Sequence, residues 1–241
     1  MMRFTVEPSP AGGYHVRLRG TPAPLSHHDT EEEAEARRAA YERGAGTRPG
    51  SERVDLPDGS EVIVRPVEPE DKPLFAAAWE RFGDESRYRR FMAAKPRLSP
   101  DDLAYLTEVD HVDHEAIGAI EPATGAGLGV ARYARNPDRP HTAEAAVAVI
   151  DAWQGRGLGG VLLRRLCARA AENGISGFTA SLFTHNRSML HLFERLGQVR
   201  VRGHDGATME IDVELAIGDP PALELALRTA ATGHVHVGSG R

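Results

Sequence analysis

The stretch that decides the fold is Val147-Ala148-Val149-Ile150-Asp151-Ala152-Trp153-Gln154-Gly155-Arg156-Gly157-Leu158-Gly159-Gly160. It opens on an apolar run typical of a buried strand and closes on a glycine-rich turn. A helix is expected next, over Val161 to Asn173, with an apolar side of leucines. Glycines ahead of a helix let backbone N–H groups converge, and the helix N-terminus adds partial positive charge. The stretch therefore predicts a phosphate cradle that needs no lysine, although a tight strand-to-helix turn explains the glycines about as well.

Two common phosphate-binding motifs do not fit this stretch. A Walker A loop carries Gly-Lys-Ser/Thr after its glycines, and none follows here. The glycines between residues 155 and 160 also miss the Rossmann spacing, and the preceding strand comes late in its domain rather than first. Neither a P-loop nor a dinucleotide fold is predicted.

The stretch does resemble the acyl-CoA pyrophosphate loop of the GCN5-related N-acetyltransferase (GNAT) superfamily. That family's pattern, Gln/Arg-x-x-Gly-x-Gly/Ala, is matched from Gln154 to Gly159. A second cofactor motif is matched from Asn186 to Gly197, where an asparagine opens a helix and Leu192-Phe193 precedes the closing glycine. The resemblance covers residues 62–215 and implies an α/β (α+β) fold, with a central mixed, mostly antiparallel sheet flanked by helices.

Within that superfamily, the chain is similar to bacterial protein lysine acetyltransferases. The shared segments are Glu85 to Phe91, Leu106 to Ala116, and the pair Ala143-Glu144. The resemblance implies acetyl-CoA as co-substrate and the transfer of an acetyl group to an amine, most simply the ε-amine of a protein lysine. Some of those relatives carry an added regulatory or ligase-like domain, and this sequence shows nothing of that size.

Three parts are predicted along the chain. Residues 1–50 form a small β-β-α extension and linker, with a strand at Tyr14 to Leu18 and a helix from Glu31 to Arg43. Residues 54–215 form the acetyltransferase domain, in which strands and helices alternate. Residues 216–241 are expected to be helical at first and then flexible.

The catalytic base predicted here is Glu144. An amine attacks a thioester only when neutral, and a lysine amine, with a pKa of about 10.4, is mostly protonated at pH 7, so a base is needed. Glu144 matches the family's catalytic glutamate, and the strand period places Ala146 and Ala148 on its face, which leaves room for an amine. The alternative is a glutamate that simply faces water.

The resemblance also implies how the co-substrate is held. Backbone groups of Val149, Ile150 and Asp151 would pair with the pantetheine arm, and the Val149 N–H would polarise the thioester carbonyl. Asn186 would contact the arm, unless it only caps its helix. The pyrophosphate would lie on the loop formed by Gln154, Gly155, Arg156, Gly157, Leu158, Gly159 and Gly160. Phe193 stands where many relatives have a tyrosine acid, so the thiolate is expected to leave unassisted, with Ser188 or a water as weaker alternatives.

Composition limits the other classes of function. The chain has 241 residues, 41% of them hydrophobic and 27% charged, with a formal net charge of -6. That balance supports a folded core and argues against nucleic-acid binding through phosphates. The single cysteine, Cys167, cannot form an internal disulfide, and His111 and His114 lack a His-Glu-x-x-His spacing, so no metal is expected. No apolar run approaches the roughly 18 residues that span a bilayer, so a cytoplasmic protein without membrane contact is expected.

Three functions remain open from the sequence. The first is protein lysine acetylation; the second is the same chemistry on a small amine, since acceptor loops vary on a shared scaffold. The third is a CoA-binding sensor without turnover, which Phe193 and the N-terminal extension favour weakly. The sequence leaves open the acyl chain length, a homodimeric state and the role of residues 1–50.

Overall fold

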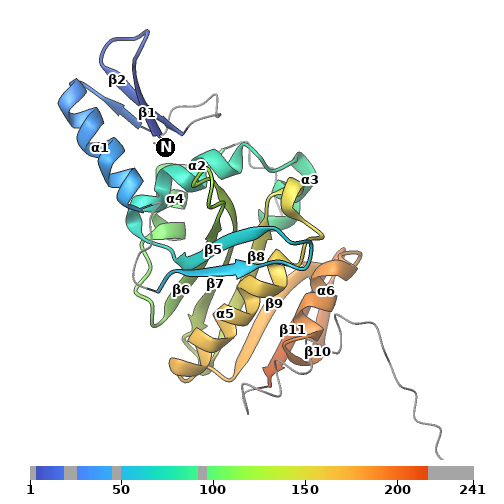
Figure 1. Ribbon diagram of the computed structural model, residues 1–241. Coiled ribbons are helices and arrows are strands. Elements are labelled where there is room, and N and C mark those ends of the chain that lie inside the picture. Colours follow the sequence, from blue (N-terminus) through green and yellow to red (C-terminus); the bar gives the residue numbers. More distant parts are fainter. Residues whose placement is uncertain (1–3, 19–25, 45–49, 92–96, 217–241) are drawn as a thin grey trace, which may run out of the picture.

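The structure is a computed structural model that describes residues 4–18, 26–44, 50–91 and 97–216. These residues form two sheets, a small one near the N-terminus and a large one that carries most of the core (Figure 1). The predicted tail helix lies outside the described residues. No helix in the described ranges is long and apolar enough to cross a membrane.

The large sheet has eight strands in the order β10-β11-β9-β8-β7-β6-β5-β4. Neighbouring strands are antiparallel except for β8 and β9, which run parallel. This mixed, mostly antiparallel sheet confirms the predicted fold class. Its strands are β4 (Glu52–Asp55), β5 (Glu61–Pro66), β6 (His114–Ile120), β7 (Gly127–Asn136), β8 (Arg139–Val149), β9 (Gly177–Phe183), β10 (Gly197–Asp205) and β11 (Thr208–Leu215).

Helices cover both faces of this sheet (Figure 1). On one face α5 packs against β6, β7 and β8, and its leucines fill the main core. On the other face α2 packs against β7 and α4 packs against α2. The helical segments are η1 (Pro69–Asp71), α2 (Lys72–Trp79), α3 (Asp84–Phe91), α4 (Pro100–Thr107), η2 (Asp151–Trp153), α5 (Leu158–Glu172) and α6 (Arg187–Glu194).

The burial pattern of β8 follows its sequence. Ala143, Ala145 and Val147 are buried on the α5 side, whereas Glu144, between the first two, is exposed on the opposite face. The strand period of two produces this division. β8 therefore presents small side chains and one carboxylate to the face that α2 and α4 only partly cover.

The N-terminal unit is smaller and differs in one respect from the prediction. It contains β1 (Phe4–Pro8), β2 (Tyr14–Leu18), β3 (Ser26–His28) and the helix α1 (Glu31–Gly44). The third strand was not predicted, because Ser26-His27-His28 has no apolar alternation and is a strand only through its pairing with β2. Val16 and Ala34 of this unit pack with Ala126, which lies in the turn between β6 and β7.

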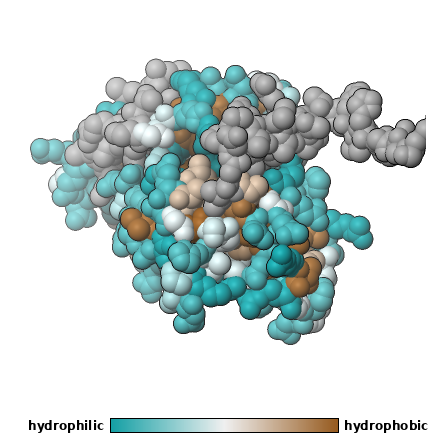
Figure 2. Space-filling view, turned by 90° about the horizontal axis from the view of Figure 1, so that it is seen from below, coloured by the Kyte–Doolittle hydropathy of each residue, from teal (hydrophilic) through white to brown (hydrophobic). Residues whose placement is uncertain are grey.

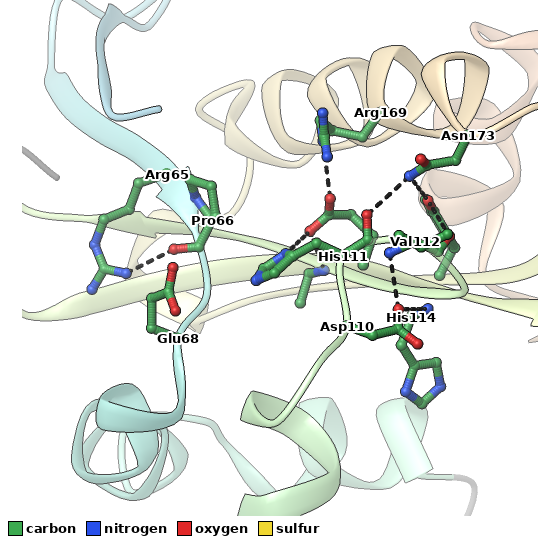
Figure 3. A network of polar contacts seen from close by, with 12 residues as sticks. Arg65, Pro66, Glu68, Asp110, His111, Val112, His114, Arg169 and Asn173 are labelled. Atoms are coloured by element: carbon green, nitrogen blue, oxygen red, sulfur yellow. Dashed lines mark hydrogen bonds and ion pairs between the residues drawn. The ribbon is translucent and has the colours of Figure 1, made fainter. Parts of the chain in front are cut away.

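A polar network fixes the loop that precedes β6 (Figure 3). The buried Glu115 carboxylate accepts hydrogen bonds from Arg169 Nε on α5 (3.0 Å) and from the Ala116 amide. Its Oε1 also lies 2.7 Å from His111 Nδ1. Asn173 donates to the His111 carbonyl at 3.0 Å. His111 holds a φ of 60°, a left-handed conformation that a non-glycine residue keeps only when its surroundings impose it.

The surface is mainly hydrophilic on the face seen in Figure 2, with apolar atoms in small groups near its centre. Among the described residues, the large apolar side chains that are most exposed are Tyr88, Tyr105, Val112 and Val201. They come from different elements, as expected for a solvated surface without one dominant apolar patch.

Candidate functional site

The site begins where the large sheet divides. β8 pairs with β9 only from Thr142 to Glu144, opposite Gly177 to Thr179, while its pairing with β7 continues to Val149. From residue 145 onward, the edge of β8 that faces β9 therefore has no strand partner among the described residues. Such an edge presents backbone N–H and C=O groups to a ligand.

The direction of these backbone groups can be worked out from two hydrogen bonds. The Ile150 N–H donates to the Leu128 carbonyl on the β7 side (3.0 Å), whereas the Val149 carbonyl accepts from the Gln154 side chain (3.0 Å). Because backbone groups alternate along a strand, Val147 and Val149 both face the open edge. The Ile150 carbonyl accepts from Trp153 at 2.9 Å, so both backbone groups of Ile150 are already engaged.

The glycine-rich turn lies next to this open edge. Gly155 and Gly157 have φ values of 75° and 89°, in the left-handed region that glycine adopts without strain. Gly157 is the N-cap of α5 and offers no side chain, and the first turn of α5 carries no acid. The N–H groups of Leu158, Gly159 and Gly160 therefore start the helix without intrahelical partners, the arrangement that binds anions.

Side chains within the turn tie it to α3. The Asp151 carboxylate accepts from the Gly83 amide at 3.1 Å, just ahead of α3. Gln154 Nε2 donates to Asp151 Oδ1 (3.2 Å) and to Ser86 Oγ (3.3 Å), besides the Val149 carbonyl. Gln154 thus occupies a carbonyl on the open edge, and it can release that bond because it has two other acceptors.

Arg156 lies within the turn, and Asn186 lies at the start of α6. Arg156 stacks on Trp153, with its Cζ 4.8 Å from the ring centroid, and its Nη1 lies 3.6 Å from Asp58 Oδ2. Hydrogen bonds from Ser60 hold the pKa of Asp58 below its usual value, which keeps this carboxylate charged. Asn186 accepts from the Met189 amide at 3.2 Å and so caps α6, the structural role that the sequence also allowed.

Glu144 lies at the closed end of the split, in the last pair between β8 and β9. Its side chain is exposed on the face opposite α5. Val147, three residues along the strand, is about 10 Å away and has its N–H on the open edge. The predicted base thus lies where the pairing of β8 and β9 ends, and the predicted loop follows the end of the unpaired part of β8.

Phe193 is buried, with 1% of its surface exposed, so it belongs to the core under α6. Ser188 in the same helix is exposed. No cluster of three or more potential metal-ligating side chains occurs in the ranges that the structure describes.

Two parts of the site were missed from the sequence. A cavity of about 80 Å³ lies between the sheet and α2, and its floor includes Gly129, Val130 and Ala148. Beside it, Arg132 is only 4% exposed although it carries a charge. A lone arginine within the apolar run from Gly127 to Tyr133 was the signal that could have identified this position.

Comparisons with known proteins agree with this geometry. The family model "Acetyltransferase (GNAT) family" matches residues 75–198. The chain is 36% identical over 162 residues to "Acetyltransferase Pat" of Mycolicibacterium smegmatis, covering 66% of this chain and 48% of that protein. It is 32% identical over 158 residues to "Acetyltransferase PA5475" of Pseudomonas aeruginosa, covering 65% of this chain and 84% of that protein.

A solved structure supports the same assignment. The crystal structure of the GNAT domain of S. lividans PAT is 31% identical, with a TM-score of 0.64, and the match covers 70% of this chain and 99% of that domain. The chain therefore belongs to the acetyltransferase (GNAT) family, as the resemblance predicted. It spans about half the length of the Mycolicibacterium relative.

Proposed function

We propose that the protein is an acetyl-CoA-dependent N-acetyltransferase that acts on the ε-amine of a protein lysine. The observation that carries the proposal is the split between β8 and β9, with Glu144 at its closed end and the N-terminus of α5 at its mouth. The similarity to Acetyltransferase Pat of Mycolicibacterium smegmatis and to the GNAT domain of S. lividans PAT supports the same class of activity.

The co-substrate fits the donors that are present. Its pyrophosphate would accept from the free N–H groups at the start of α5, where Gly155 and Gly157 leave the approach open. Its pantetheine amides would pair with Val149 and with the backbone of Asp151, while Gln154 withdraws from the Val149 carbonyl. Asn186 keeps its cap and can offer its side-chain N–H₂ to the arm. Because both of its backbone groups are engaged, Ile150 would contribute its side chain rather than a backbone bond.

The chemistry then needs only a proton acceptor and an oxyanion donor. Glu144 takes a proton from the ammonium, directly or through a water, and the neutral amine attacks the thioester carbon. The resemblance implied the Val149 N–H as oxyanion donor; we assign this role to the Val147 N–H instead, because it faces the same open edge and lies closer to Glu144. Collapse of the intermediate breaks the C–S bond, and the departing CoA thiolate takes up the proton that the attacking nitrogen loses as the amide forms. The thiol pKa is ordinary, about 8.5, so this step needs no protein acid in place of Phe193.

The replacement Glu144→Gln tests this mechanism. It keeps the shape of the side chain and removes its basicity, so we expect kcat to fall by about a hundredfold or more, with acetyl-CoA affinity unchanged by calorimetry. Glu210→Gln, an exposed glutamate on β11, is the matched control and should retain full activity. Undiminished acetylation by Glu144→Gln would remove Glu144 from this role.

The acceptor is identified by CoA release with a panel of small amines and lysine-bearing proteins. Release that requires a protein, with the acetylated lysine located by mass spectrometry, is the expected result. Release with a small amine alone would replace lysine acetylation by the second function, and tight CoA binding without any release would indicate a sensor.

A further inference from the structure

Arg132 is a charged residue buried in the middle of β7. Arg132 pairs across the sheet with Ala146 and is 4% exposed. Both terminal nitrogens, Nη1 and Nη2, are shielded from solvent and lack a hydrogen-bond partner within the described part of the chain. Leaving a buried charge unpaired is among the more costly arrangements in a protein, so a partner is expected at some stage of the functional cycle.

Tyr105 of α4 holds the plane of this guanidinium. The Arg132 Cζ lies 4.0 Å from the centroid of the Tyr105 ring, and His114 packs edge-on against the same ring at 5.2 Å. Stacking occupies the face of the guanidinium and leaves its N–H edges pointing sideways. Those edges form a rigid fork that matches a carboxylate with two parallel hydrogen bonds. Tyr105 itself is 57% exposed, so its ring can turn outward to admit a ligand.

The position of Arg132 relates it directly to the proposed base. Ala134 pairs with Glu144 and Arg132 with Ala146, so the side chains of Arg132 and Glu144 are diagonal neighbours on one face. The Cβ atoms of such a pair lie about 7 Å apart. Burial lowers the pKa of Arg132, and the charges of Tyr105 and Glu144 oppose this effect, which is consistent with their closeness. Among the ion pairs formed by the described residues, none joins Arg132 to Glu144 or to any other acid.

We propose that Arg132 is a specificity-determining residue that binds a carboxylate of the acceptor while the acceptor's amine lies at Glu144. This inference rests on the proposed function and adds the chemistry of its substrate: an amine with a carboxylate a few ångströms away. The carboxylate comes either from an acidic side chain next to the target lysine or from the acceptor molecule itself when that molecule is an amino acid.

Matched acceptor pairs test the inference on the full chain. One pair is a lysine-centred peptide with glutamate on both sides of the lysine and the same peptide with glutamine there. The other pair is 4-aminobutyrate and its amide. We expect the wild type to prefer a carboxylate member by about tenfold in kcat/KM, since a charge-assisted pair supplies that much. The pair that shows the preference identifies the source of the carboxylate.

The replacement Arg132→Met should abolish this preference. The KM for the carboxylate member is expected to rise to that of its amide partner, with kcat at saturation and acetyl-CoA affinity little changed. Arg200→Met, an exposed arginine on β10, is the control and should keep the preference. Equal use of both members by the wild type, or a preference that survives Arg132→Met, would overturn the inference while leaving acetyltransfer in place.

Two further measurements separate the remaining outcomes. If no acceptor releases CoA, the proposed function fails, and calorimetry with the same acceptors in the presence of CoA tests the inference. Binding of the carboxylate acceptor that is lost in Arg132→Met supports the inference. Absence of acceptor binding to the wild type overturns it. The melting temperature tests a purely structural role. Removing an unpaired buried charge should leave it unchanged or raise it, whereas a fall of more than about 5 °C would show that the guanidinium holds the fold.

Discussion

Gly155 and Gly157 share a left-handed conformation but differ in their surroundings, and this difference leads to a prediction. A Cβ at Gly157 would lie 3.0 Å from Pro57 Cδ, whereas a Cβ at Gly155 would meet nothing within 4 Å. Gly157→Ala should therefore lower the free energy of unfolding by more than the roughly 1 kcal/mol that a left-handed alanine costs. It should also weaken acetyl-CoA binding about tenfold, because the first turn of α5 must shift. Denaturant unfolding and calorimetry measure both effects.

The control for this pair is Gly59→Ala, which has the same left-handed φ and open surroundings away from the cradle. It should lose about 1 kcal/mol of stability without any change in acetyl-CoA affinity. Equal losses for Gly155→Ala and Gly157→Ala would mean that the Pro57 contact relaxes freely.

Cys167 on α5 gives a second prediction at this scale. Burial raises the pKa of its thiol to about 12, from 9.0, which lowers the thiolate fraction at pH 8 about a thousandfold. We expect no reaction with an aromatic disulfide reagent in the native protein and one equivalent in denaturant. Rapid reaction of the native protein would show that α5 opens locally. The same inertness keeps thiol-based assays of CoA release free of background.

Individual residues also show what the sequence could and could not predict. The glycine turn and the Asn186 cap follow from local patterns, because a turn and a helix start are encoded by neighbouring residues. Glu144 was identified through its match to the family's catalytic glutamate, and the strand period indicated only that it shares a face with Ala146 and Ala148. The partners of Gln154 could not be predicted, because Ser86 lies on α3 and meets the turn only in the fold. The position of Arg132 is marked by a lone charge in an apolar run, but its stacking on Tyr105 could not be predicted, because α4 is placed against β7 only in the fold.

At the scale of elements, the loop before β6 and the helix α5 are coupled through one buried carboxylate. Glu115 is 1% exposed and bonds to both, while Arg169, whose pKa its hydrogen bond raises, is partly exposed. Glu115→Gln should reduce the free energy of unfolding by about 2 kcal/mol, because it replaces the buried carboxylate, which accepts from Arg169 and Ala116, by a neutral amide with one acceptor oxygen. Glu172→Gln removes an exposed partner of the same arginine and should cost less than about 0.5 kcal/mol. Equal costs would place the coupling at the surface instead.

Element boundaries were predictable in proportion to local signal. The start of α4 has a strong local signal, since Ser99 accepts a hydrogen bond from the Asp102 N–H and Pro100 follows at the first helical position. By contrast, the domain start at residue 54 lies inside β4, which begins at Glu52 and owes its strand character to pairing with β5. Short strands of this kind form through pairing with another strand, so the sequence of the strand alone does not predict them.

For the molecule as a whole, the split sheet explains how one fold separates two tasks. Under the proposed function, the co-substrate would bind at the N-terminus of α5, beside the unpaired end of β8. The acceptor would reach Glu144 from the face under α2 and α4. β8 and β9 separate without leaving the sheet, because each strand keeps an antiparallel partner on its other side. The resemblance implied a mixed, mostly antiparallel sheet, but the partial pairing of β8 with β9 was not predicted, because it joins residues far apart in the sequence.

The small N-terminal unit packs on the turn between β6 and β7 through an apolar cluster, and this packing can be tested. Ala126 is 6% exposed and packs against Val16 and Ala34. Ala126→Glu would bury a charge there, so we expect the unit to release from the turn and trypsin to cleave α1 about tenfold faster. Acetyl-CoA affinity should stay within about twofold, because every group assigned to its binding lies between Gly83 and Asn186. Ala123→Glu, exposed in the same turn, is the control and should alter neither property. Lost acetyl-CoA binding in Ala126→Glu alone would mean that the N-terminal unit supports the site through the β6–β7 turn.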